Sequence, residues 1–193
     1  DTGNINTTAQ SNVTYYENTY NIPWNNVASA HIFVDDKECI ICIPTTEKAW
    51  HVLYDAPTDN IWYNKDANDV AIGVEICYFS DRERSRKALD NGARVLAYLS
   101  EYWHIDYKTR MPGHQDIQAD KQDPGNALEA SGYGRNTSNL DKLVAKYYKQ
   151  NVKVKATPVK VEKGSTSFTR EEFVKWLKST VGKQYDYDLY AAF

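Results

Sequence analysis

Residues 70–79 read VAIGVEICYF, an almost unbroken apolar run that is rich in β-branched side chains. Such a run predicts a buried, central β-strand. Glu75 is the single charge within it, and a carboxylate among apolar side chains loses hydration energy unless it is paired or lies near a metal. Two interpretations follow. Either Glu75 lies at a partly wet sheet edge in a salt bridge to Lys or Arg, or it is a functional carboxylate that faces a cleft.

The chain after this strand predicts helices. Residues 80–83 (SDRE) form a capping box, and the helix that follows runs to about Trp103 with an apolar face opposite its charges. Pro112 and Gly113 then open a polar loop through residues 114–125. A further helix is predicted near residues 138–150, where leucine and valine recur at helical spacing.

The chain before this strand predicts a helix, a hairpin and a long loop. Residues 7–20 have helical spacing, with Thr7 or Thr8 as the N-cap. The predicted extended segments are residues 29–34 and 38–43, which form a hairpin, and residues 48–53. Residues 54–69 are rich in Asp, Asn, Pro and Thr and predict a long surface loop. Together these elements predict an α/β domain with a mixed central β-sheet flanked by helices.

The composition is that of an ordinary globular protein, with 193 residues of which 41% are hydrophobic and 25% charged. The formal net charge is -3, so the chain lacks the basic field that general nucleic-acid binding needs. No apolar run approaches the roughly 20 residues of a membrane span, and the N-terminus has no signal-peptide pattern. We therefore expect no nucleic-acid and no membrane partner. We also expect the protein to be a monomer.

The polar loop HQDIQADKQDPG, residues 114–125, is the second candidate for chemistry. His114 and Asp123 are nine residues apart, so they can converge across the loop on one metal ion, and Lys121 would then lie beside the metal. The alternative is a solvated polar loop with no ligand.

The other histidines and the cysteines give weaker signals. His31 lies in a predicted strand and is expected to be a hydrogen-bonded sheet residue, whereas His51 follows Trp50 and either contacts substrate or packs. Cys39 and Cys42 form a C-x-x-C that is also compatible with zinc or redox chemistry. Positions i and i+3 of a strand point to opposite faces, so small buried thiols are the favoured interpretation.

Five segments, in chain order, resemble the zinc-dependent N-acetylmuramoyl-L-alanine amidases of the phage-lysozyme and peptidoglycan-recognition type (amidase type 2). The resemblance extends over about residues 1–148. The matching segments are DTGN at 1–4, ASAHIFVD at 28–35, AWHV at 49–52, IGVEIC at 72–77, and GHQDI with KQDPG at 113–117 and 121–125. Each is weak alone, but five in order with fitting separations are specific.

The resemblance implies a zinc ion held by two His and one Asp or Cys, with water in the fourth position. By motif match, His114 and Asp123 are the second and third protein ligands. The first would be a His immediately before Asp1, so we expect the chain as given to be metal-poor or inactive while the protein it comes from is active. His31 is not a ligand in the family pattern.

The resemblance also implies roles in amide hydrolysis. Glu75 would accept the proton of the attacking water and pass it to the leaving amine, and Lys121 would stabilise the oxyanion of the tetrahedral intermediate. Some members carry a Tyr before the hairpin His, but Ala30 stands there in this chain, so Glu75 would carry the proton transfer. Trp50 and His51 are candidates for binding the substrate.

The domain boundaries follow from a change of composition after the last predicted helix. Residues 1–150 are expected to form the amidase domain without its first strand, and residues 151–166, with alternating Val and Lys, a linker. Residues 167–193 resemble the truncated start of a CHAP domain, a cysteine- and histidine-dependent amidohydrolase-peptidase of staphylococcal phage lysins. They are therefore expected to form an incomplete helical segment without its nucleophilic Cys.

The resemblance implies a peptidoglycan hydrolase, either an endolysin or an autolysin, that acts on the muropeptide stem. The expected location is the bacterial cell wall on the outer side of the membrane, with host cytoplasm before holin-type release as a second place for a chain without a signal peptide. The alternative function is a peptidoglycan-binding module that does not cut, because one fold can serve both.

Overall fold

The computed structural model describes residues 4–19, 21–23, 26, 28–55 and 57–149. The predicted linker at 151–166 and the predicted CHAP-like segment at 167–193 lie outside the described residues. Within the described part no helix is both long and apolar enough to cross a membrane.

The described strands form one small mixed sheet, which confirms the predicted fold class. Strand β1 (Ile32–Val34) pairs antiparallel with β2 (Cys39–Ile41) and parallel with β3 (Val74–Ile76), in the order β2-β1-β3. The first two strands are the predicted hairpin. The parallel partner requires a crossover segment, which the chain between Cys42 and Gly73 supplies.

The apolar run at residues 70–79 forms a much shorter strand than its composition predicts, and the expectation that it is central is wrong for the described strands. Only Val74–Ile76 is paired as β3, and it lies at the edge of the described sheet, with β1 in the middle. Val70 instead ends a short helix, and the backbone N–H of Phe79 donates to the Ser85 hydroxyl at 2.8 Å. The flanking apolar residues therefore belong to the connections.

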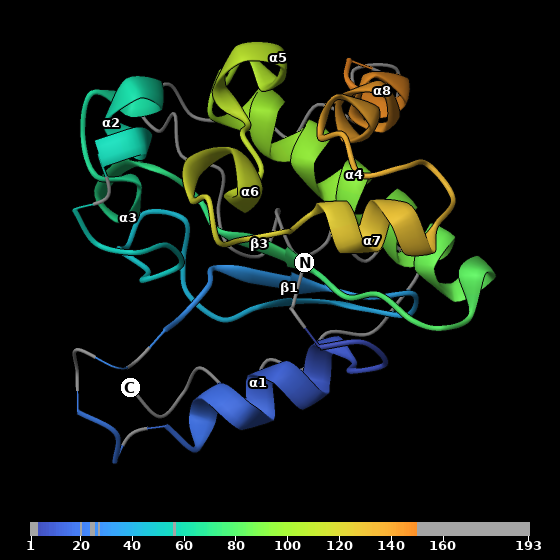
Figure 1. Ribbon diagram of the computed structural model, residues 1–193, viewed down its shortest axis with the longest axis horizontal. Coiled ribbons are helices and arrows are strands. Elements are labelled where there is room, and N and C mark those ends of the chain that lie inside the picture. Colours follow the sequence, from blue (N-terminus) through green and yellow to red (C-terminus); the bar gives the residue numbers. More distant parts are fainter. Residues whose placement is uncertain (1–3, 20, 24–25, 27, 56, 150–193) are drawn as a thin grey trace, which may run out of the picture.

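The sheet lies between helices on both faces (Figure 1). Helix α1 (Ala9–Glu17) covers one face and the long helix α4 (Arg82–Tyr102) covers the other, with α8 (Ser138–Tyr147) packed against α4. Because strand side chains alternate, Phe33 packs with Tyr16 of α1 at 5.4 Å between ring centroids, while Ile32 and Val34 join a cluster with residues of α4. All three residues of β1 are consequently buried.

Helix α1 begins where the sequence predicts, whereas the N-cap of α4 is Asp81 and not Ser80 of the predicted capping box. Thr8 caps α1 by accepting from the Ser11 N–H, and Asp81 caps α4 by accepting from the N–H groups of Glu83 and Arg84. Helix α1 ends at Glu17, short of the predicted Tyr20. Gly92 lies inside α4, where a Cβ atom would approach Ile76 Cδ1 of β3 to 2.5 Å, so glycine allows the helix to lie close to the strand.

Several short helices lie in parts of the chain where the sequence patterns predicted a loop or no helix. Residues 54–69 form α2 (Pro57–Tyr63) and α3 (Ala67–Val70) instead of a loop. At the start of α3, Asp66 is the N-cap, and the buried Asp59 of α2 also accepts from the Ala67 N–H at 2.9 Å. The remaining short helices are α5 (Tyr107–Arg110), α6 (His114–Ile117) and α7 (Gly125–Ala130).

The extended segment at residues 48–53 does not form a strand. The Ser29 N–H donates to the Trp50 carbonyl at 2.8 Å and the Trp50 N–H donates to the Ser29 hydroxyl at 2.9 Å. Neither Cys39, which is buried, nor Cys42, which is half-buried, forms a disulfide. No group of three His, Cys, Asp or Glu in the described ranges could hold a metal. The described structure thus gives no support to a C-x-x-C zinc site.

A buried carboxylate organises the hairpin turn. Asp35 is 0% exposed, and its carboxylate accepts from the N–H groups of Ala9, Lys37 and Glu38 at 3.0, 2.6 and 2.8 Å. The turn is therefore fixed to the start of α1 by a single side chain.

Replacing Asp35 by asparagine is expected to lower the free energy of unfolding by about 3 kcal/mol, because the amide N–H₂ would face a buried N–H donor. Urea unfolding at neutral pH measures this. Lys37→Ala, in the same turn but exposed, is the control and should change stability by less than about 0.5 kcal/mol. Equal effects of the two substitutions would contradict the role of Asp35.

Candidate functional site

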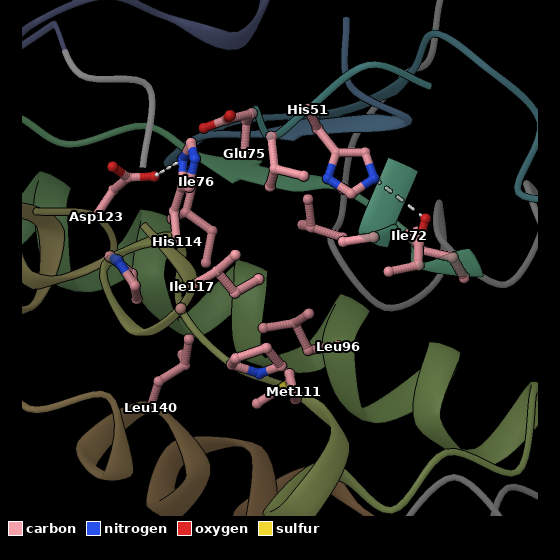
Figure 2. A pocket seen from close by; sticks show the side chains of 18 of the residues that line it. His51, Ile72, Glu75, Ile76, Leu96, Met111, His114, Ile117, Asp123 and Leu140 are labelled. Carbon is pink, nitrogen blue, oxygen red and sulfur yellow. Dashed lines mark hydrogen bonds and ion pairs between the residues drawn. The ribbon is translucent and has the colours of Figure 1, made fainter. Parts of the chain in front are cut away.

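One pocket collects four of the polar side chains singled out in the sequence (Figure 2). Its polar lining comes from His51, Glu75 of β3, His114 at the start of α6, and Asp123. Its apolar lining includes Ile72, Leu96, Met111, Ile117 and Leu140. Strand, helix and loop residues far apart in the chain thus surround one space.

His114 and Asp123 form a close pair on this pocket. Their Nδ1 and Oδ2 atoms are 3.1 Å apart, and both side chains are largely shielded, with 17% and 16% exposed. Burial alone would raise the pKa of Asp123, but the hydrogen bond and positive charge of His114 outweigh it and lower that pKa to about 2. Burial would likewise lower the pKa of His114, yet Asp123 raises it above its ordinary value. At mildly acidic pH His114 is therefore protonated, Asp123 is ionised, and the two side chains form an ion pair.

Glu75 is the buried carboxylate beside this pair. The residue is half-buried overall, and its Oε2 atom is inaccessible to solvent. Burial raises the pKa of Glu75, the negative charge of Asp123 raises it further, and the positive charge of His114 opposes both. A carboxylate with a raised pKa in a cleft is a candidate for proton transfer.

His51 forms another wall of the pocket. Its Nε2 lies 3.2 Å from the Ala71 carbonyl, so this nitrogen donates and Nδ1 is left as an acceptor. Burial and the neighbouring His31 lower its pKa to about 4, so the ring is neutral. A Cβ atom on Gly73 would approach the His51 ring to 2.6 Å, and glycine there lets the ring pack on the strand.

The remaining residues singled out in the sequence lie outside the pocket lining. His31 is buried and uses both ring nitrogens, one with the Glu47 carbonyl at 3.0 Å and one accepting from the Gly73 N–H at 3.0 Å, as expected of a sheet residue. Lys121 is exposed and does not line the pocket, although its charge reaches His114. Trp50 is 38% exposed, with Lys48 Nζ 3.9 Å from its ring centroid, and it too lies outside the lining.

Three residues near the site were not predicted from the sequence to belong to it. Asn68 of α3 accepts from the N–H groups of His51 and Val52 and donates to the Val52 carbonyl. Gln118 contacts His114 Nε2 at 3.0 Å. The pKa of Tyr16 is raised to about 12 by burial and by the charge of Glu75. Polar residues of this kind are common on loops and helices, so only the fold distinguishes them.

The described donors fit part of a zinc site. Imidazole nitrogen and carboxylate oxygen are zinc ligands, and His114 and Asp123 present both types at a separation that one ion can span. No third His, Cys, Asp or Glu within the described residues completes a metal-binding group. The residues present therefore supply two of the ligands that a catalytic zinc needs.

A mixed α/β domain that places a His–Asp pair and a buried glutamate around one pocket has the components of a hydrolytic enzyme. The chain belongs to the N-acetylmuramoyl-L-alanine amidase family, Amidase_2, whose profile matches residues 1–126. It is 38% identical over 113 residues to the N-acetylmuramoyl-L-alanine amidase CwlA of a Bacillus species, covering 52% of this chain and 42% of that protein. The chain thus spans less than half the length of the curated relatives it matches.

Solved structures agree with this assignment of the fold. The PlyG catalytic domain is 29% identical with a TM-score of 0.52, over 75% of this chain and 76% of that chain. The Staphylococcus aureus hydrolase AmiA, solved in complex with its ligand, has a TM-score of 0.58 at 23% identity, over 76% of this chain and 69% of that chain. At that identity the likeness to AmiA shows the fold alone.

Proposed function

We propose that this protein hydrolyses peptidoglycan at the amide bond between N-acetylmuramic acid and the L-alanine of the stem peptide. The observation that carries the proposal is the convergence of Glu75 with the His114–Asp123 pair on one pocket. Membership of the amidase family supplies the reaction class. The proposed place of action is the cell wall, and the proposed partner is the muropeptide itself.

Zinc is the proposed cofactor, held by His114 and Asp123 together with a further ligand. When bound, zinc lowers the pKa of a water molecule towards ~7 and polarises an amide carbonyl. The proposed donor set is completed by a His before Asp1. The proposal is tested by comparing zinc binding by two proteins. One is this chain, and the other is a version extended N-terminally through the His-containing strand that the family resemblance implies.

The chain's own residues would handle the proton and the substrate. Glu75 would take the proton from the attacking water as the water oxygen bonds to the amide carbon. It would then deliver that proton to the alanine nitrogen as the carbon–nitrogen bond breaks. His51 Nδ1 would accept from a substrate N–H, and Trp50, outside the pocket, would contact the substrate further along.

A binding module without catalysis is the alternative function. The measurement that separates the two is the release of free amino groups, without reducing sugars, from purified cell walls with zinc supplied. The hydrolase proposal expects such release from the extended chain. Retained wall binding with no release would favour the binding module.

Lys121→Ala is expected to lower kcat by roughly 10²-fold in the extended chain, with a smaller change in KM, because one group that stabilises the oxyanion would be lost. Lys121 is exposed, but it lies close enough for its charge to influence His114. Steady-state hydrolysis of a soluble muropeptide measures the effect. Lys65→Ala, an exposed lysine outside the pocket lining, should leave kcat unchanged, and an unchanged rate for Lys121→Ala would reject the role.

A further inference from the structure

Gln118 lies just after α6 and connects His114 to the opposite wall of the pocket. Its Oε1 atom is 3.0 Å from His114 Nε2 and accepts from the Leu53 N–H at 3.1 Å. Its Nε2 atom donates to Asp120 at 2.9 Å. The side-chain amide of Gln118 therefore connects three groups: the His114 ring, the backbone of Leu53 and the polar loop.

Two of these partners fix the orientation of the Gln118 amide. A backbone N–H can only donate, so the atom facing Leu53 is the oxygen. The Asp120 carboxylate is an acceptor, so the atom facing it is the nitrogen. The oxygen that faces Leu53 also faces His114, and His114 must therefore carry its proton on Nε2 to hydrogen-bond there.

The consequence for His114 is a defined direction of its lone pair. With Nε2 donating to Gln118, the nitrogen that can give a lone pair to a metal is Nδ1. Nδ1 is the atom that lies 3.1 Å from Asp123 Oδ2. Without a metal, Nδ1 carries a proton that it donates to this carboxylate, and a bound metal would replace that proton between the two side chains.

The backbone that sets this orientation is itself held in place. Asn68 of α3 accepts from the N–H groups of His51 and Val52 and donates to the Val52 carbonyl, so the segment before Leu53 is fixed from the α3 side. Gln118 fixes the same segment from the α6 side. The Leu53 N–H is thereby a stationary donor against which the amide is aligned.

We propose that Gln118 is the positioning residue of the metal centre: it locks His114 with Nε2 protonated and Nδ1 directed at the metal, and couples that ring to the His51–Leu53 wall of the pocket. Gln118 touches neither metal nor reacting atoms and acts through His114. Partners of this kind typically change metal affinity by about 10–100-fold when removed. The zinc part of this inference rests on the proposed function, whereas the ring orientation does not.

Gln118→Leu is expected to weaken zinc binding by about 10–100-fold, measured with a competing chelator on the N-terminally extended chain. Gln118→Glu keeps the oxygen that accepts from His114 but loses the hydrogen bond to Asp120, so it should bind zinc more tightly than the leucine variant. Gln122→Leu is the matched control, because Gln122 lies in the same loop but accepts from Arg135. Gln118→Met replaces the leucine variant if that variant does not fold.

The second readout is the exchange rate of the His114 Nε2 proton in metal-free protein, at a pH where both ring nitrogens are protonated. The hydrogen bond to Gln118 should slow this exchange in the parent, and Gln118→Leu should speed it. The inference is overturned if Gln118→Leu binds zinc as tightly as Gln122→Leu and keeps the parent exchange rate, or if Gln118→Glu binds zinc no better than the leucine variant. A parent that binds no zinc would refute the proposed function, while the exchange rates would still decide the role of Gln118.

Discussion

Replacing Glu75 by glutamine is expected to lower the rate of cell-wall hydrolysis by on the order of 10³-fold while leaving the fold and zinc binding intact. Glutamine has nearly the same shape as glutamate, so the packing beside β1 is preserved. Its amide cannot accept the proton of water near neutral pH. The rate should therefore fall through kcat, with little change in KM.

The structure explains why this one carboxylate should matter so much. Its Oε2 atom is inaccessible, and burial raises the pKa of Glu75, which makes this carboxylate a better proton acceptor than an ordinary glutamate. The measurement is the pH profile of kcat/KM, whose acidic limb in the parent should reflect Glu75. Glu83→Gln, on the exposed first turn of α4, is the control. A fully active Glu75→Gln protein would remove Glu75 from the mechanism.

Replacing Asp123 by asparagine is expected to abolish zinc binding at micromolar concentrations and to reduce hydrolysis by at least about 10³-fold. The carboxylate supplies a charged ligand, and a neutral amide oxygen is a much poorer partner for zinc. Zinc content after dialysis and the rate of wall hydrolysis measure the two effects. Asp55→Asn, an exposed aspartate outside the pocket lining, should change neither. Normal zinc content in Asp123→Asn would exclude it as a ligand.

The same substitution should change the stability of the metal-free protein in a pH-dependent way. The raised pKa of His114 means that its contribution is fully present below 6.5 and is lost as the pH rises through the folded-state pKa. The pKa of Asp123, lowered from 3.8 to about 2, means that its contribution is present above 3.8 and is lost as the pH falls towards 2. The pair therefore stabilises the fold most between about pH 4 and 6.5.

Urea unfolding of the metal-free parent and of Asp123→Asn across pH 2–9 tests this window. The difference in unfolding free energy should be largest, on the order of 2 kcal/mol, between those limits and should shrink on both sides. A difference that stays constant with pH would show that His114 and Asp123 are not paired in solution.

Much of the fold follows from local signals in the sequence. The hairpin of β1 and β2, the cap at Thr8, and the approximate lengths of α4 and α8 depend on side-chain periodicity and on hydrogen bonds between near neighbours. Sequence patterns report such short-range preferences directly. The order of the motifs also indicated the amidase family, which the family match confirms.

The short helices α2, α3 and α6 did not follow from the sequence patterns. For α3, one stabilising partner lies outside the helix itself. Asp59 supports the start of α3 only because burial brings its carboxylate to the Ala67 N–H. Apolar composition alone also overestimated the length of β3, because a strand extends only as far as its partner strand pairs with it. Propensity describes a segment in isolation, whereas these segments adopt the shape that their partners require.

The sequence by itself determined which chemical groups this protein has: one acid in an apolar strand, and a His and an Asp nine residues apart in a polar loop. Only the tertiary structure decided that they meet, that His51 forms the facing wall, and that Gln118 sets the direction of the His114 ring. The reason is physical. Residue type and spacing fix the available donors and charges, but the pKa of a carboxylate and the direction of a lone pair depend on burial and on partners contributed by other parts of the chain.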